Sequence, residues 1–404
     1  MRLSRKENDS LKFAENRRFQ KIASKFFDYL KSLIIFDFCG DFAAKPCYNI
    51  PMKDELLLWY DQTKRDLPWR RTRDPYAIWL SEIMLQQTRT ETVRGYWQRF
   101  LERFPTVQAL AAADEEDVLK MWEGLGYYSR ARNLHACAKA VCALHGGLFP
   151  QTAAALKALP GIGDYTAGAV ASIVFGERTS AVDGNVERVV ARLCGIRENV
   201  GVPSVRRALR AQAEALVPAD RPGDWNQAMM ELGARVCLPG APKCEACPLC
   251  AFCDAYAAGD AAALLVKTKK APQKVERRAV GIAICCGRAL VLRREEGLLR
   301  GLWTFPCPKG GAEALLAHLA ENGVNARIVR ETGHVRHVFT HRVWEMELYL
   351  LATDGASCPP GWRWADASEL AALPMPAAMK KARELALSTE APTFSENESG
   401  GDSL

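Results

Sequence analysis

The chain has 404 residues, of which 49% are hydrophobic and 25% are charged, and its formal net charge is +7. This length and apolar content suffice for two or three domains that each bury a core, so a globular protein is expected. The moderate basic excess suits a polyanionic partner but does not establish one.

Neither a membrane span nor export is indicated by the sequence. No apolar run reaches the roughly eighteen residues that a bilayer requires, and the early apolar segment 30–38 is interrupted by Lys31 and Asp37. The first residues also lack the basic stub and apolar core of a signal peptide. We therefore expect no membrane association and a cytoplasmic location, nucleoid-associated if the source is bacterial.

Residues 1–50 mix charged and aromatic side chains without a clean period, and we expect a poorly ordered extension there. Apolar residues at near-helical spacing predict a first helix over 54–64, which Asp-Leu-Pro-Trp-Arg at 66–70 ends. Asp74 can cap the next helix, because its side chain accepts hydrogen bonds and a proline follows it at the first helical position. This second helix is expected over about 75–86.

Glu82 lies on an apolar stripe of the second predicted helix. The stripe is formed by residues three or four positions away on the same face: Ile78, Trp79 and Leu85. Burial penalises the charged form of a carboxyl group, so the pKa of Glu82 should be raised enough for it to hold a proton near neutral pH. The alternative is a structural carboxylate that Arg70 or Arg71 neutralises.

A run of amphipathic helices is predicted over 101–156, with breaks at Pro105 and at 123–126. The second break continues into Gly-Tyr-Tyr-Ser-Arg-Ala-Arg at 126–132. Aromatic and basic side chains together suit stacking on bases while phosphates are contacted, which favours an exposed position. Tyrosines packed in the core are the alternative.

The sequence Leu-Pro-Gly-Ile-Gly-Asp-Tyr-Thr-Ala-Gly at 159–168 predicts two short helices joined by a hairpin, with the second helix starting near Tyr165. Gly161 and Gly163 permit backbone angles that a side chain would resist. Backbone N–H groups at a helix N-terminus suit a phosphate, which would give sequence-independent grip on a nucleic-acid backbone. A plain turn without a ligand is the alternative.

Asp183 follows in Ala-Val-Asp-Gly-Asn at 181–185, directly before a helix predicted over 186–193. A carboxylate in this place is either a simple helix cap or a functional group.

Four cysteines form a compact cluster in the sequence: Cys237, Cys244, Cys247 and Cys253. Thiolates at such spacings in a cytoplasmic protein predict a metal site, for which zinc and iron–sulfur are both candidates. Cys250 falls within the loop but off the pattern.

The composition changes after this loop. Residues 259–278 are rich in alanine and then lysine, which predicts a basic linker. Alternating strands are then expected over 279–286, 289–293, 327–330 and 343–350, with a helix over 312–322 between them. The Ser-, Glu- and Gly-rich tail is expected to be disordered.

Two motifs carry a family resemblance: the hairpin sequence at 159–168 and Val-Asp-Gly-Asn-Val at 182–186. They resemble the helix-hairpin-helix DNA glycosylase superfamily, and within it the MutY-type adenine DNA glycosylases, and the resemblance covers about residues 56–387. Gly-Leu-Trp-Thr-Phe-Pro at 301–306 and Phe-Thr-His at 339–341 resemble the C-terminal domain of the same family.

The resemblance implies a multidomain protein, in which an all-α helix-hairpin-helix glycosylase domain with a [4Fe–4S] loop precedes a smaller α+β Nudix-like domain. The expected parts are an extension over 1–50, the all-α catalytic region over 51–258, the linker over 259–278, the Nudix-like domain over 279–387 and the tail over 388–404. Within the catalytic region, the six-helix subdomain is expected over about 76–184, and the cluster subdomain over 51–75 plus 185–258.

The implied activity is monofunctional: a monomeric enzyme would flip and hydrolytically remove adenine mispaired with 8-oxoguanine or guanine in double-stranded DNA, in base excision repair. The implied catalytic group is Glu82, Tyr165, Asp183 and Asn185. Protonated Glu82 would deliver a proton to adenine N7, and ionised Asp183 would stabilise the sugar cation. The residues implied to contact the mispair are Arg70, Gln87, Leu125, Tyr127, Gln227, Phe339, Thr340 and His341, and those implied to contact the DNA backbone are Gly161 and Gly163.

The resemblance also favours a [4Fe–4S] cluster over zinc, with Cys237, Cys244, Cys247 and Cys253 as its ligands. In many relatives the lesion-reading loop is Phe-Ser-His, whereas this chain has Thr340 at the middle position. Threonine keeps the hydroxyl group and adds a methyl group.

Three other functions are compatible with parts of the sequence. An endonuclease III-type glycosylase/lyase acting on damaged pyrimidines shares the hairpin and the cluster, but it needs a nucleophilic lysine where this chain has Tyr165. A non-catalytic DNA-binding protein would not need Glu82 on an apolar stripe. A Nudix hydrolase would need a Mg²⁺-binding acidic box, whose region is occupied here by the alanine- and leucine-rich segment 312–320.

Overall fold

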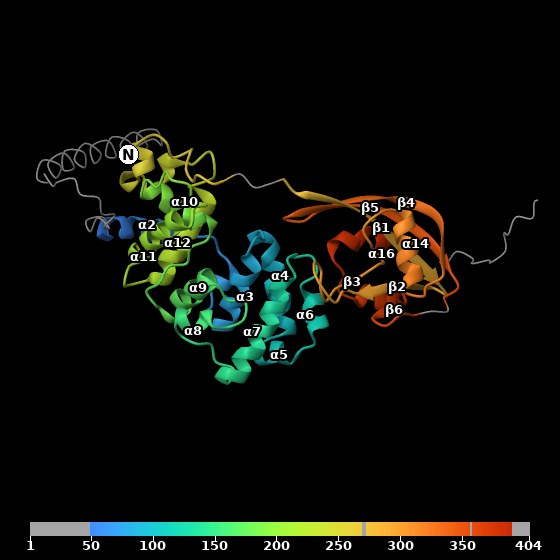
Figure 1. Cartoon of the computed structure of the whole chain (residues 1–404). Helices are drawn as coiled ribbons and strands as arrows, with labels where there is room; N and C mark the ends of the chain where they lie inside the picture. The colour runs from blue at the N-terminus through green and yellow to red at the C-terminus, as the bar shows by residue number, and fades with distance from the viewer. Residues whose placement is uncertain (1–48, 269–271, 356–357, 390–404) are drawn as a thin grey trace, which may run out of the picture. The chain divides into compact units, whose positions relative to one another are not determined.

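The computed structural model of the chain describes residues 49–268, 272–355 and 358–389 (Figure 1). The extension expected over 1–50 and the tail expected over 388–404 lie almost wholly outside these ranges. The described chain consists of a helical region followed by a region built on a β-sheet. None of the helices described has the length and hydropathy that a transmembrane segment needs.

The helical region is built from short and medium helices that follow one another closely. The α-helices are α2 (Asn49–Thr63), α3 (Pro75–Leu85), α4 (Thr90–Arg103), α5 (Val107–Ala112), α6 (Glu115–Met121), α7 (Ser129–His145), α8 (Ala153–Lys157), α9 (Asp164–Phe175), α10 (Gly184–Leu193), α11 (Pro203–Ala215), α12 (Pro222–Arg235) and α13 (Asp254–Ala257). The 3-10 helices of this region are η2 (Pro68–Arg70), η3 (Cys244–Ala246) and η4 (Cys250–Phe252).

Local signals in the sequence set the starts of the helices that matter for the site. The side chain of Asp74 accepts a hydrogen bond of 3.1 Å from the backbone N–H of Tyr76, and a proline occupies the first helical position of α3. The predicted hairpin is present, because α8 and α9 flank the turn at 158–163. The predictions of a capped second helix and of a helix-hairpin-helix element are therefore confirmed.

Two hydrophobic cores hold the helical region together. The first lies among α3 to α9 and includes the fully buried Trp79 and Trp122. The second joins α2 to α10, α11 and α12 and includes Trp225. Helix α9 packs against both α3 and α12 and so connects the two cores. The residues expected to be catalytic lie on α3, on α9 and at the start of α10, at this junction.

The C-terminal region contains a six-stranded sheet in its described residues, with the order β3-β2-β1-β5-β4 and with β6 paired to β2. Its strands are β1 (Lys274–Cys285), β2 (Arg288–Arg293), β3 (Trp303–Thr304), β4 (Ala326–Val338), β5 (Arg342–Thr353) and β6 (Trp362–Ala365). Its helices are α14 (Ala312–Glu321), α15 (Ala367–Ala372), η5 (Ala377–Met379) and α16 (Lys380–Ser388). Strands β1 and β5 run parallel, with Val280 opposite Leu348, and the other pairs are antiparallel. The expected α+β fold is confirmed.

Strand β1 is buried on both faces, as the parallel strand of a covered sheet should be. One face, with Ala279 and Ala283, packs on α14. The other face belongs to a core that also contains residues of α16. Gly281 allows α14 to approach closely, because a Cβ atom there would lie 3.0 Å from a methyl group of Leu315. Helices α14 and α16 therefore cover opposite faces of the sheet at β1.

The sheet extends beyond the strands that the sequence predicts. Strand β1 begins at Lys274, so the end of the segment expected to be a linker belongs to the sheet. Two charged residues in this stretch, Glu276 and Arg278, are buried because they pair, whereas Lys274 and Arg277 are exposed. Arg278 Nη2 donates to Glu276 Oε2 at 3.0 Å, and Arg342 Nη1 donates to Glu276 Oε1 at 3.2 Å. Strand β4 is likewise longer than predicted, and the short strands β3 and β6 were not predicted.

Candidate active site

Glu82 and Tyr165 face each other across the junction of α3 and α9. The Tyr165 hydroxyl group donates a hydrogen bond of 2.6 Å to Glu82 Oε2. Glu82 is only 6% exposed. Burial raises the pKa of Glu82 to about 7; the bond from Tyr165 opposes this rise, and the charge of Asp183 adds to it. The raised pKa expected from the apolar stripe is confirmed, and near neutral pH the group is divided between its two protonation states.

The arginines that were considered as partners of Glu82 pair with other acids. Arg70 Nη2 donates to Glu231 Oε2 at 2.9 Å, and Arg71 forms an ion pair with Asp66. Glu231, whose side chain is fully buried, also accepts a bond of 2.8 Å from Arg65 Nε. Glu82 therefore forms no ion pair with Arg70 or Arg71, and the guanidinium group of Arg70 pairs with Glu231 instead.

Asp183 is the N-cap of α10, as one interpretation of the sequence had it. Its Oδ1 accepts hydrogen bonds from the backbone N–H groups of Asn185 and Val186, at 2.9 and 2.8 Å. Its Oδ2 accepts a bond of 2.9 Å from the Asn185 side-chain amide. Burial raises the pKa of Asp183 above its ordinary value, while these donors oppose the rise. The capping role does not exclude a chemical one, because Asp183 also acts electrostatically on Glu82.

Arg188 is a site residue that the sequence analysis missed. Its guanidinium group donates to Asn185 Oδ1 at 3.0 Å, to the Gly233 carbonyl at 2.8 Å and to the Cys237 carbonyl at 2.7 Å. Because Asn185 Oδ1 accepts from Arg188, the amide nitrogen of Asn185 is directed at Asp183. Arg188 lies three residues after Asn185 on the same helix, and residues three apart share a helix face. This spacing was the signal in the sequence from which the contact could have been predicted. Arg188 thus connects the start of the cysteine loop to the carboxylate.

The expectation that the hairpin glycines adopt backbone angles that a side chain would resist is confirmed for Gly161 and wrong for Gly163. Gly161 has φ +73°, and a Cβ atom there would lie 2.5 Å from Asn133 Cβ, so glycine is required. Gly163 has φ −93°, which any residue can adopt, so the expectation of a special backbone angle there is wrong. A Cβ atom at Gly163 would meet no atom within 4 Å. This N-cap of α9 therefore faces open space, where an approaching backbone would not be obstructed.

The Tyr-Tyr pair is divided between surface and core. Tyr127 is 46% exposed and has φ +47°, whereas Tyr128 is 7% exposed. The expected exposure therefore holds for Tyr127 and is wrong for Tyr128. The Tyr127 hydroxyl group lies 2.8 Å from Thr340 Oγ1, which brings two of the residues expected at the mispair into contact.

Arg130 was expected to be exposed for phosphate contact, and this expectation is wrong. Its guanidinium group is buried and donates to a set of neutral oxygens at 2.5–3.1 Å: the carbonyls of Ile83, Met84, Gln86, Leu125 and Gly126 and the hydroxyl group of Thr88. Burial lowers the pKa of Arg130 to about 10, so it remains protonated at neutral pH. Arg130 joins the end of α3, which carries Glu82, to the turn before Tyr127.

The other residues expected at the mispair occupy different environments. Gln87 is exposed with φ +57°, just after the end of α3. The Leu125 side chain is buried in the first core, and Gln227 is half-buried on α12. Phe339 stacks edge-on against Trp344, with ring centroids 4.9 Å apart, and His341 is exposed in the β4–β5 turn. Gln273 Nε2 donates to the carbonyls of Phe339 and Thr340 at 2.7 and 3.2 Å, which holds this turn.

The cysteine loop encloses a small cavity of about 30 Å³. The cysteines that line it are Cys237, Cys244, Cys247, Cys250 and Cys253. Arg192, which is fully buried, also lines it and donates to Cys237 Sγ at 3.1 Å. Among the described residues, no group of three or more His, Cys, Asp or Glu is spaced to hold a single metal ion. Several thiols around one cavity beside a buried cation fit an anionic thiolate-ligated cluster.

Comparisons with known proteins define the class of the protein first. The family described as "HhH-GPD superfamily base excision DNA repair protein" matches residues 80–215, and the NUDIX domain family matches residues 279–385. The first match contains the hairpin, Glu82, Tyr165 and Asp183. Fold and site thus define a base excision repair DNA glycosylase, an enzyme that hydrolyses N-glycosidic bonds, followed by a Nudix-like domain.

Similar curated proteins narrow this class. The adenine DNA glycosylase of Homo sapiens is 37% identical over 396 residues, which cover 81% of this chain and 72% of that protein. That of Mus musculus is 38% identical over 393 residues, covering 81% and 76%. The chain belongs to the adenine DNA glycosylase family. Among solved structures, a thermostable thymine-DNA glycosylase is 32% identical with a TM-score of 0.48, covering 52% of this chain and 97% of that one.

Proposed function

We propose that this protein removes adenine that is mispaired with 8-oxoguanine or guanine in double-stranded DNA, by hydrolysis of the N-glycosidic bond. The observation that carries the proposal is the Glu82 carboxyl group, which is buried, has a pKa of about 7 and lies next to Tyr165 and Asp183. A general acid is most effective when its pKa lies near the working pH. Glu82 lies within residues 80–215, which match the base excision DNA repair family, and this supports the proposal.

Glu82 acts as the proton donor to the leaving adenine. Extruding a nucleotide from the duplex costs a few kcal/mol, and less at a mismatch. The Tyr165 hydroxyl group donates to Oε2 of Glu82, so Oε1 is the oxygen that carries the proton and offers it to N7 of the base. When Glu82 gives up its proton, it becomes a buried carboxylate, which burial disfavours. The hydrogen bond from Tyr165 stabilises this carboxylate and so lowers the free-energy cost of the proton transfer.

Asp183 stabilises the positive charge that develops on the sugar as adenine departs. Its Oδ1 is occupied by two backbone N–H groups of α10, and its Oδ2 is held by the Asn185 amide. These donors favour the ionised form against the effect of burial. Arg188 fixes the orientation of that amide, so the carboxylate is held before the substrate arrives.

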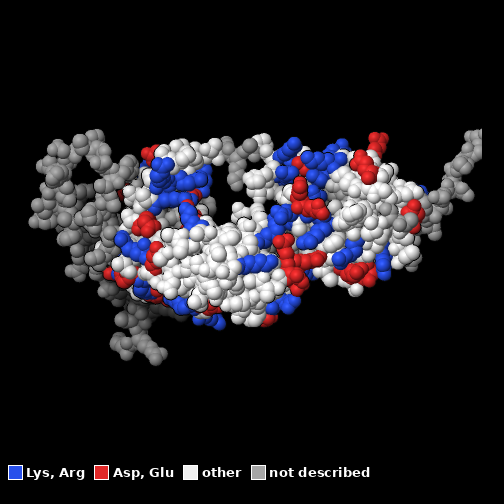
Figure 2. All heavy atoms as spheres, turned by 60° about the horizontal axis from the view of Figure 1, so that its bottom comes forward, with Lys and Arg blue, Asp and Glu red and all other residues white. Residues whose placement is uncertain are grey.

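DNA is held by its backbone at the hairpin and by its lesion at the β4–β5 turn. The first N–H groups of a helix lack helical partners, and α9 starts next to Gly163, where a Cβ atom would meet no atom within 4 Å. On the face shown in Figure 2, basic side chains are interspersed with acidic ones, so no uniform basic patch covers it. Tyr127 and Thr340 read the opposite base, with the threonine hydroxyl in the place of the serine that many relatives carry.

The cysteine loop holds a [4Fe–4S] cluster through Cys237, Cys244, Cys247 and Cys253. Such a cluster would serve to fix the loop, and Arg192 would offset part of its negative charge. The domains proposed here are the catalytic region over 51–258 and a lesion-recognition domain over 274–387, which begins earlier than the expected 279 because strand β1 starts at Lys274.

Incubation with duplexes that contain adenine opposite 8-oxoguanine, guanine, thymine or cytosine tests this function. We expect alkali-labile abasic sites at adenine for the first two duplexes and little excision for the last two. Strand cleavage without alkali on duplexes with oxidised pyrimidines would instead indicate a glycosylase/lyase. Equal excision from all four duplexes would contradict the proposed mispair specificity.

A further inference from the structure

The turn between β4 and β5, which contains Phe339, Thr340 and His341, is held by a residue outside both strands. Gln273 lies directly before β1, and its side-chain Nε2 donates to the carbonyls of Phe339 and Thr340 at 2.7 and 3.2 Å. The backbone N–H of Lys274 donates to the carbonyl of His341 at 3.4 Å. Three successive carbonyls of the turn therefore accept hydrogen bonds from the start of β1.

A glutamine side chain suits this contact chemically. Its amide nitrogen carries two N–H donors, so it can serve two carbonyl oxygens at the same time. A glutamate of the same length would place two oxygens that only accept against the same carbonyls. Gln273 is exposed to solvent, so its side chain fills no space in the core. The contact therefore depends on the amide nitrogen of Gln273 and not on the bulk of the side chain.

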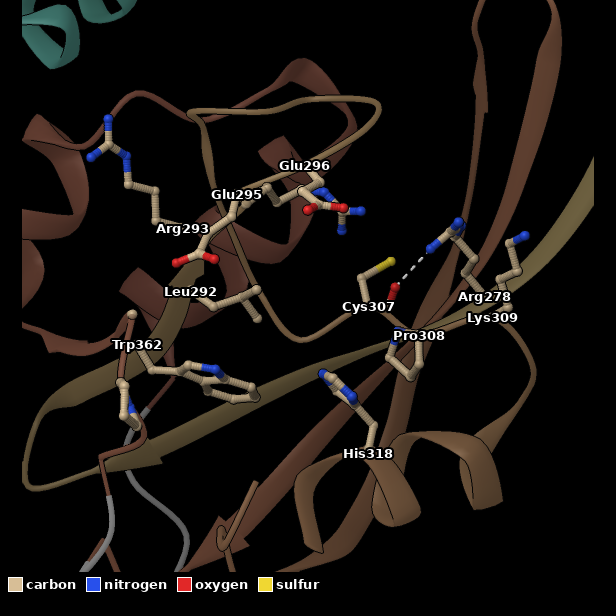
Figure 3. Close-up of a pocket in the computed structure, with 13 residues that line it drawn as sticks. Arg278, Leu292, Arg293, Glu295, Glu296, Cys307, Pro308, Lys309, His318 and Trp362 are labelled. Atoms are coloured by element: carbon tan, nitrogen blue, oxygen red, sulfur yellow. Dashed lines mark hydrogen bonds between the residues drawn. The ribbon is translucent and has the colours of Figure 1, made fainter. Parts of the chain in front are cut away.

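The start of β1 is a fixed support for Gln273. Strand β1 pairs with β5 from Lys274 onward, where Lys274 lies opposite Arg342. A few residues further along β1, the buried Arg278 bonds to Glu276 at 3.0 Å. Figure 3 shows the second bond of Arg278, which its Nη1 donates to the carbonyl of Cys307 at 2.8 Å. Because these bonds anchor β1 within the domain, Gln273 holds the turn from a rigid element.

The two carbonyls that Gln273 binds belong to the peptide groups on either side of Thr340. Each peptide group is planar, so a fixed carbonyl fixes the whole plane, and the φ and ψ angles of Thr340 lie between the two planes. Threonine is branched at Cβ and has few side-chain rotamers for a given backbone conformation. The direction of the Thr340 hydroxyl group, which lies 2.8 Å from the hydroxyl group of Tyr127, therefore follows from the bonds of Gln273.

We propose that Gln273 is a positioning residue for lesion recognition, which holds the Thr340 hydroxyl group in the orientation that distinguishes 8-oxoguanine from guanine. This inference rests on the proposed function and adds to it a residue that acts through the turn. The turn itself does not need Gln273 to form, because the backbone N–H of Phe339 donates to the carbonyl of Arg342 at 2.8 Å. Loss of the amide should therefore change recognition and leave the fold intact.

Gln273→Met in the full-length protein tests the proposal, because methionine has a similar length and no N–H donor. Single-turnover excision efficiency is measured on duplexes with adenine opposite 8-oxoguanine and opposite guanine. We expect the ratio of the two efficiencies to fall about tenfold, since two hydrogen bonds are lost. Gln273→Glu should lower the ratio at least as far. Asn325→Leu, which replaces an exposed amide directly before the other end of β4, is the matched control and should leave the ratio unchanged.

A double-mutant cycle with Thr340→Ala separates positioning from a general structural role. In the Thr340→Ala protein, Gln273→Met should change the ratio little further. Hydrogen exchange of the backbone at 339–342 should be faster in Gln273→Met than in the wild type, at an unchanged melting temperature.

An unchanged ratio in Gln273→Met, an equal loss in Asn325→Leu, additive effects in the cycle or unchanged hydrogen exchange would each overturn the proposal. These outcomes leave the proposed function in place as long as the wild-type protein excises adenine. If the wild-type protein excised adenine from neither duplex, the proposed function would be wrong and this inference with it.

Discussion

Removing the hydroxyl group of Tyr165 should shift the pH dependence of excision to higher pH. In the wild-type protein this group donates a 2.6 Å bond to Glu82 Oε2, which stabilises the carboxylate and opposes the rise in the Glu82 pKa caused by burial. A hydrogen bond to a charged group contributes about 1.5–3 kcal/mol. Its loss in Tyr165→Phe should therefore raise the Glu82 pKa by roughly one to two units.

Single-turnover excision from a duplex with adenine opposite 8-oxoguanine, measured between pH 6 and 9.5, provides the assay. The wild-type rate should fall as the pH rises through about 7, because the general acid loses its proton. In Tyr165→Phe the fall should begin one to two pH units higher, whatever the change in the maximal rate. An unchanged or lower apparent pKa would refute the reasoning that this hydroxyl group stabilises the Glu82 carboxylate.

Two further predictions concern the same site, and a third concerns the cysteine loop. Folding raises the Glu82 pKa from 4.5 to about 7, so the contribution of Glu82 to the free energy of unfolding is full below pH 4.5 and is lost as the pH rises through 7. At pH 8.5, Glu82→Gln should therefore be more stable than the wild-type protein, by at most about 3 kcal/mol. A melting temperature equal to or lower than that of the wild type would contradict this prediction. Arg188→Met should slow excision about tenfold, because the Asn185 amide loses the hydrogen bond that orients it toward Asp183. The iron content should stay unchanged, and Arg188→Lys should partly recover the rate. Excision by Arg188→Met at the wild-type rate would show that Asn185 does not need this hydrogen bond. Cys250→Ser should keep about four iron atoms per chain, whereas Cys247→Ser should lose them; loss in Cys250→Ser would place it among the ligands.

Local patterns were sufficient for the parts of the site that depend on one helix. The apolar stripe around Glu82 predicted its burial, and the Asp-Pro sequence before α3 predicted the cap. Asp183 was recognisable as a cap because the residue types and the helix start are adjacent in the sequence. In each case the relevant neighbours lie within four residues, where helical geometry is fixed.

The parts that were missed depend on partners far away in the sequence. Arg130 has the same local surroundings as a phosphate-binding arginine, but its acceptors include backbone carbonyls of Ile83 and Met84 on another helix. The start of β1 was read as linker because Glu276 and Arg278 are charged, and only their mutual pairing permits burial. Gln273 was also read as linker, because the carbonyls that it binds lie 66 and 67 residues further along the chain, where no periodicity reveals them.

The most direct test of the account compares wild-type protein with Glu82→Gln on a duplex with adenine opposite 8-oxoguanine, by single-turnover excision and by affinity. Glutamine keeps the shape of the side chain and cannot deliver a proton. The account predicts that excision falls by at least about a hundredfold, while affinity for the duplex stays within about threefold. Excision by Glu82→Gln at the wild-type rate would contradict the assignment of Glu82 as the general acid.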